Sequence, residues 1–63
     1  MEIKRYSVIV KINDEDEFEA YCDDILEYAK DQYINYCEQY EDADVSIFDN
    51  VTGNVFRNGI WKK

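Results

Sequence analysis

Carboxylates dominate the chemistry that this sequence offers, and they are concentrated in one stretch. Residues 13–27, NDEDEFEAYCDDILE, contain eight Asp and Glu side chains and no Lys or Arg. Carboxylates at this density suit three tasks: binding a divalent cation, acid–base catalysis, or docking against a positively charged partner. Like charges one helical turn apart repel by a few tenths of a kcal/mol per pair, so their concentration indicates a compensating benefit.

The first two tasks fit the sequence poorly. An EF-hand calcium loop requires Gly at its sixth position, and no register starting at Asn13, Asp14 or Asp16 provides one. The chain has no His, two Cys and two Ser, so a nucleophile would lack its usual base. Cys22 and Cys37 do not have the CxxC spacing of zinc sites. We therefore expect no metal site, no cofactor and no enzymatic activity.

The two cysteines are expected to be free thiols. If both lie on one helix, their Cα atoms are roughly 22 Å apart. A disulfide requires a separation of about 7 Å or less. On this interpretation an intrachain bridge between Cys22 and Cys37 is excluded.

The net charge of −8 is unevenly distributed along the chain. Residues 13–44 contain thirteen acidic residues and a single base, Lys30, whereas both ends are mildly basic. Hydrophobic residues make up 46% of the chain, which predicts one folded domain over residues 1–63 rather than disorder. No apolar run approaches the ~20 residues of a membrane span, and Met1 is followed by EIKRY rather than a signal peptide. We expect a cytoplasmic protein with no membrane association.

The residue patterns predict a long helix after an N-terminal strand. Residues 2–12, EIKRYSVIVKI, are rich in β-branched and aromatic residues, and the even-numbered positions from Lys4 to Ile12 share one face. From there to about residue 42, apolar side chains repeat with helical spacing and no Gly or Pro intervenes. Asn13 or Asp14 offers a cap. This segment therefore predicts one amphipathic helix of nearly thirty residues, roughly 40 Å long.

Two further strands complete an α+β fold. DVSIFDN and VFRNGIWKK read as strands, and the residues between them suit a turn with Gly53 in the left-handed conformation. The element order is therefore β-α-β-β. We expect the helix to cover one face of a three-stranded, mostly antiparallel sheet, with the last strand in the middle.

On such a helix, seven carboxylates share an arc of roughly 100° opposite the apolar side, over about 28 Å. They are Asp23, Asp24, Glu27, Asp31, Glu38, Glu41 and Asp42. Solubility alone could explain an acidic surface, but such surfaces normally mix signs and gain from Glu–Lys pairs. Alternatively, a rigid row of carboxylates imitates the phosphates of duplex DNA and docks into a groove lined with Lys and Arg. This second interpretation requires an unbroken helix.

In size, acidity and the runs NDEDEFEAYCDD and EYAKDQYINYCEQYEDAD, the chain resembles the small acidic inhibitors encoded by phages and mobile elements. This class includes anti-restriction proteins, uracil-DNA glycosylase inhibitors and some anti-CRISPR proteins. The resemblance implies a DNA-mimic inhibitor that is not an enzyme. Its partner would be a basic, nucleic-acid-binding protein, such as a host enzyme or nuclease, and not nucleic acid itself.

The sheet face away from the helix suggests an alternative function. It is expected to be apolar, aromatic and basic, and the simplest use of such a surface is a homodimer or another protein interface. The candidate residues are Ile3, Ile9, Phe48, Arg57 and Trp61. On this hypothesis the protein is a homo-oligomeric accessory module whose acidity keeps it soluble. Stacking of single-stranded bases on the same aromatics is a third hypothesis, which the net charge of −8 disfavours.

Overall fold

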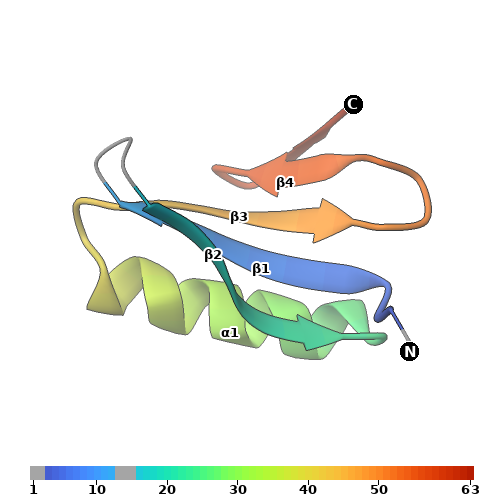
Figure 1. Cartoon of the computed structure of the whole chain (residues 1–63), viewed down its shortest axis with the longest axis horizontal. Helices are drawn as coiled ribbons and strands as arrows, with labels where there is room; N and C mark the ends of the chain where they lie inside the picture. The colour runs from blue at the N-terminus through green and yellow to red at the C-terminus, as the bar shows by residue number, and fades with distance from the viewer. Residues whose placement is uncertain (1–2, 13–15) are drawn as a thin grey trace.

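The described residues of the protein form one five-stranded antiparallel sheet with a single helix against one face (Figure 1). The computed structural model describes residues 3–12 and 16–63. The elements are β1 (Tyr6–Ile12), β2 (Asp16–Asp23), α1 (Leu26–Gln39), β3 (Asp44–Asp49), β4 (Val55–Arg57) and β5 (Ile60–Lys62). The spatial order of the strands is β2-β1-β3-β4-β5. The α+β class is confirmed, whereas the predicted three-stranded sheet with the last strand in the middle is wrong.

The largest difference from the sequence prediction lies in the first half of the predicted helix, which forms β2. Helix α1 has 14 residues rather than nearly thirty. At its start β2 alternates acidic and apolar side chains, which is the strand period of two. Pairing with β1 places Phe18 opposite Val10 and Glu17 opposite Lys11. Apolar residues and opposite charges at facing register positions thereby replace the repulsion of a continuous acidic helix.

Helix α1 begins without the predicted cap. Residue Ile25 occupies the N-cap position and makes no side-chain cap hydrogen bond. The predicted caps, Asn13 and Asp14, lie outside the described residues. Within the part of the chain that the structure describes, no helix is long and apolar enough to cross a membrane.

Two hairpins follow β3, where the sequence analysis predicted only one. Gly53 has φ 80° and donates its N–H to the Asp49 carbonyl at 2.8 Å, which confirms the predicted left-handed turn. Asn58 and Gly59 also have positive φ, at 54° and 81°. Two consecutive positive φ values define a tight two-residue hairpin turn. This turn divides the predicted last strand into β4 and β5.

The hydrophobic core lies between α1 and one face of the sheet. Val8, Val10 and Ile47 are fully buried, as the alternation in residues 2–12 predicts for β1. Ala29 is the one fully buried side chain of α1 among the described residues, and its small size allows the helix close to the sheet. The buried apolar residues are Tyr6, Val8, Val10, Ala29, Val45, Ile47 and Phe56.

Candidate functional site

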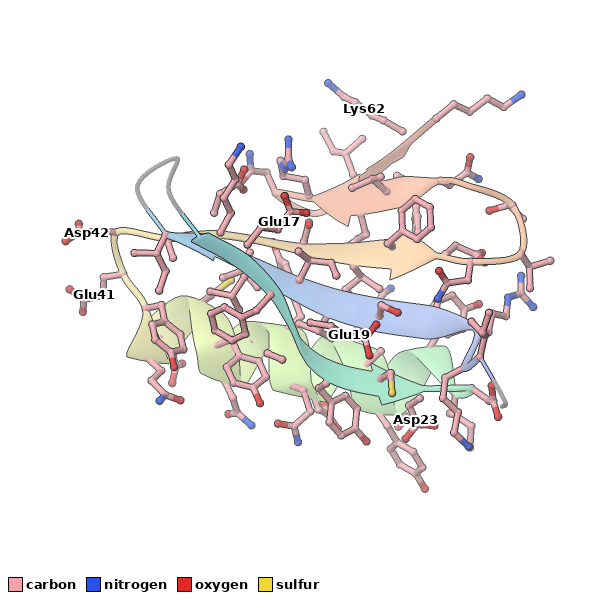
Figure 2. The ribbon with its side chains drawn as sticks, in the orientation of Figure 1. Glu17, Glu19, Asp23, Glu41, Asp42 and Lys62 are labelled. Carbon is pink, nitrogen blue, oxygen red and sulfur yellow. The ribbon has the colours of Figure 1, made fainter. Side chains whose placement is uncertain are left out.

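The seven carboxylates predicted to form one stripe are distributed over several elements. Asp23 ends β2 and Asp24 follows it, α1 carries Glu27, Asp31 and Glu38, and the turn after α1 carries Glu41 and Asp42. Figure 2 shows Asp23 near one end of α1 and Glu41 and Asp42 beyond the other. Because β2 replaces the first half of the helix, the predicted continuous row of about 28 Å is wrong. The full DNA-like rod loses its structural basis with it.

Three of the seven remain in line on α1. Glu27, Asp31 and Glu38 are separated by four and seven residues, so they lie within about 40° around the helix axis and about 16 Å along it. All three are exposed. Ile34, which is 54% exposed, lies between them on the same line. We call Glu27, Asp31, Ile34 and Glu38 the α1 line.

The single lysine of α1 does not neutralise this line. Lys30 places its Nζ 5.1 Å from the centroid of the Phe56 ring, so its charge is directed to the sheet in a cation–π contact. The ion pairs among the described residues are Lys4–Asp24, Arg5–Asp49 and Arg57–Asp44. None of them includes a member of the α1 line, so its three charges are exposed and have no cationic partner among residues 3–12 and 16–63.

The C-terminal end of α1 is an unfavourable place for negative charges. The last turn of α1 has no basic residue and contains Glu38, and the acidic pair Glu41 and Asp42 follows after Tyr40, the C-cap residue. Carboxylates near a helix C-terminus oppose the macrodipole, at a cost of a few tenths to about 1 kcal/mol each. Helix stability therefore does not explain why these residues are acidic.

Asp23 and Asp24, by contrast, have structural roles. Asp23 accepts hydrogen bonds from the Tyr21 hydroxyl at 2.7 Å and the Ile25 N–H at 3.0 Å. The Tyr21 bond, followed by the Ile25 bond, lowers the pKa of Asp23, and the same hydroxyl contact raises the pKa of Tyr21. Asp24 accepts the Arg5 N–H at 3.0 Å. Both carboxylates thus hold the turn between β2 and α1 in place.

The sheet face opposite α1 is the second candidate site. The strand register aligns one row of side chains across the whole sheet, formed by Cys22, Ser7, Phe48, Val55 and Lys62. Glu19, Ile9 and Ser46 form the neighbouring row. Because side chains alternate along a strand, both rows point away from the helix. We call this surface, with Ile9, Phe48, Val55 and Ile60 as its apolar members, the open face.

Three of the five residues predicted for this surface lie on it. Ile9 and Phe48 are half-buried, and Arg57 is exposed and pairs with Asp44 at 3.2 Å. Ile3 precedes β1, outside the sheet, and is 79% exposed. The apolar and basic character predicted for this face is therefore present, with different aromatic content.

The placement of Trp61 on this face is wrong. Its ring lies 5.3 Å from the Phe56 ring and 6.3 Å from the Tyr6 ring, between centroids, on the side of the core. The turn at Asn58 and Gly59 is the reason, since it pairs Trp61 directly with Phe56 and so assigns both to one face. Base stacking on Trp61 at the open face is thereby excluded.

The two edges of the open face carry charges of opposite sign. Glu17 and Glu19 project from β2, and Lys62 lies on β5 at the opposite edge of the sheet (Figure 2). At the basic edge the surface is hollowed by a cavity of about 360 Å³, lined by Val55, Arg57, Asn58, Ile60, Lys62 and Lys63. Sequence reasoning missed this cavity. The Asn58-Gly59 dipeptide, a strong hairpin signal, could have revealed the fold of β4 against β5 that forms it.

The two cysteines are free and exposed, on β2 and α1 respectively. Their predicted location on one helix is wrong, although the predicted free state is confirmed. Desolvation and the adjacent Glu19 carboxylate raise the pKa of the Cys22 thiol. A thiol with a raised pKa is a weak nucleophile at neutral pH.

Comparison with known proteins adds no family to these observations. The chain matches no family model, and searches of curated proteins and of solved structures found no match. The functional assignment therefore rests on the chemistry and geometry of the two surfaces, the α1 line and the open face.

Proposed function

We propose that this chain is a small non-enzymatic inhibitor that docks its α1 line against the cationic, nucleic-acid-binding surface of a partner protein. The observation that supports this proposal most strongly is the alignment of Glu27, Asp31 and Glu38, all exposed and without a cationic partner among the described residues. The only lysine of the helix is directed to Phe56 instead.

The short helix sets the size of the imitated ligand. The α1 line offers about one charge per 5 Å, against about one per 1.7 Å of axis for duplex DNA. Its length of about 16 Å corresponds to roughly five base pairs at 3.4 Å each. The fitting partner therefore has a short groove with a few Lys or Arg side chains, and not a long channel for duplex DNA.

Ile34 adds an apolar contact at the centre of the line. Protein interfaces commonly place an apolar anchor inside a charged or polar rim that excludes water. Ile34 is 54% exposed between Asp31 and Glu38, and Tyr28, 52% exposed, lies on the same helix. The charges would accelerate association and the anchor would slow dissociation.

A capture experiment tests this proposal. The chain is coupled to beads at low density, incubated with a lysate containing nucleic-acid-binding proteins, and the captured proteins are released with duplex DNA. We expect E27Q/E38Q to weaken capture about tenfold, equivalent to about 1.4 kcal/mol. E17Q/E19Q removes the same number of charges from the other side of the sheet and should retain capture. Equal loss in both variants would show that net charge alone attracts the captured proteins, against the proposal.

A further inference from the structure

We propose that the open face binds the open face of a second copy, forming a twofold-symmetric dimer with two stacked sheets between two outer helices. The inference is independent of the proposed function, because the α1 line stays on the outside of this assembly. The second copy would cover the face of the sheet that α1 leaves uncovered.

The centre of the open face has the composition of an interface. Ile9, Phe48 and Val55 are half-buried within one chain, and Ile60 remains 57% exposed. The serines between them, Ser7 and Ser46, are buried at 5% and 7% exposure. Small side chains beside larger apolar ones leave a surface on which a second sheet can stack at about 10 Å.

The edges of the open face carry opposite charges. Glu17 and Glu19 lie on β2, and Lys62 lies on β5, the strand at the other edge. Among the described residues, none of these three takes part in an ion pair within one chain. Arg57 contributes a further positive charge beside Lys62, although it also pairs with Asp44.

Symmetry selects one orientation of the second copy. A twofold axis parallel to the strands and midway between the sheets places β2 of each copy over β5 of the other. Glu19 then faces the cavity that Arg57 and Lys62 line, and the contact occurs twice. An axis that is parallel to the sheets but perpendicular to the strands would instead place β2 over β2, so that the carboxylates of the two copies would face each other. Like charges facing each other across an interface disfavour that arrangement.

The area of the face predicts a weak dimer. Five strands about 4.8 Å apart and on average about 17 Å long cover roughly 400 Å². A typical stable complex buries about 800 Å² per partner. We therefore expect a dissociation constant of about 10–100 μM, so that the monomer predominates in dilute solution.

Sedimentation equilibrium over a series of concentrations tests the dimer. At low salt the average mass of the wild type should rise from 7.6 kDa toward twice that value. E19K and K62E should each weaken association at least tenfold, and the double variant E19K/K62E should regain it, since the swap restores opposite charges at both contacts. E27Q/E38Q, altered only on the α1 line, should associate like the wild type.

Two results would overturn the inference. One is a wild type that keeps the monomer mass at about 1 mM, well above a micromolar dissociation constant. The other is a double variant that associates no better than the two single variants while all three unfold with wild-type cooperativity. Neither result depends on the capture experiment, so failure of the dimer and failure of the proposed inhibitor are distinguishable.

Discussion

The two faces of the sheet are built from the same strands but are completed differently. On the side of α1, Val8, Val10 and Ile47 are fully buried under the helix. On the open face, Ile9 and Phe48 are half-buried and bordered by charged edges. The described residues form one helix for two faces of the sheet, so one face is covered and the other is not. The comparison separates residues that determine folding from residues available for binding.

The largest effect should come from two neighbours on β3 that point to opposite faces. Ile47→Ala removes a fully buried side chain and should lower the free energy of unfolding by about 2–5 kcal/mol. Phe48→Ala should cost clearly less in dilute solution, where the open face is not covered. Urea denaturation at low protein concentration measures both. A similar loss for the two variants would mean that the open face is as much a part of the core as the covered one.

A smaller loss of stability is expected from a substitution in the turn that connects β4 to β5. Gly59 has φ 81°, and an added Cβ would have no atom within 4 Å, so Gly59→Ala tests backbone conformation alone. The cost should be about 1–2 kcal/mol. Asn58→Gly, at φ 54°, is the matched control and should leave stability unchanged or raised. Thermal unfolding followed by Trp61 fluorescence measures both changes, and a neutral Gly59→Ala would contradict the assigned turn.

Acidification should lower the free energy of unfolding, because it protonates Asp49 on the covered side of the sheet. Burial favours its neutral form, but hydrogen bonds from the Val51 N–H, the Arg5 guanidinium and the Thr52 N–H outweigh this and lower its pKa below 3.8. Because the unfolded carboxyl has the higher pKa, ionised Asp49 stabilises the fold fully above that value. This contribution is lost as pH falls through the lower, folded pKa.

The comparison with Asp49→Asn isolates this effect from the general change in charge. The stability difference between wild type and variant should be constant from pH 7 to about 5 and should shrink below about 4. Chemical denaturation at each pH measures it. A difference that stays constant down to about pH 2 would show that the carboxylate is not stabilised in the fold.

The smallest expected change in stability concerns the α1 line, and it is an increase rather than a loss. Glu38→Gln removes a charge that opposes the helix macrodipole, so it should raise the free energy of unfolding by a few tenths of a kcal/mol. The same change should weaken capture of cationic partners. Urea denaturation beside a capture assay measures the two quantities. A destabilised variant would indicate that Glu38 serves the fold rather than binding.

Local patterns predicted the parts of the fold in which one signal dominates. The alternation through Val8 and Val10 identified β1 and its buried face, and Gly53 identified the first hairpin. The residues of α1 were also predicted to be helical, and Ala29 and Tyr36 pack on the core as their spacing indicates. In each case a period or a special backbone conformation had a single interpretation.

The prediction failed where two periods fitted the same residues. Phe18 and Cys22 have helical spacing with Ile25, yet Glu17, Phe18 and Glu19 also alternate as a strand. Pairing with β1 decided between them, because it places Glu17 opposite Lys11. Both residues lie in one short stretch, but the helical spacing of the apolar residues was followed through it and the strand pairing was not considered, so the helix was extended too far. The candidate site was reduced accordingly, from seven aligned carboxylates to three.

The binding role of the α1 line is tested most directly by the concentration of duplex DNA that releases half of a captured nucleic-acid-binding protein. We predict that DNA competes with the wild type and with E17Q/E19Q at the same concentration, and that E27Q/E38Q requires about tenfold less. Release of the captured protein by salt but not by DNA, or equal half-release concentrations for all three chains, would contradict the account.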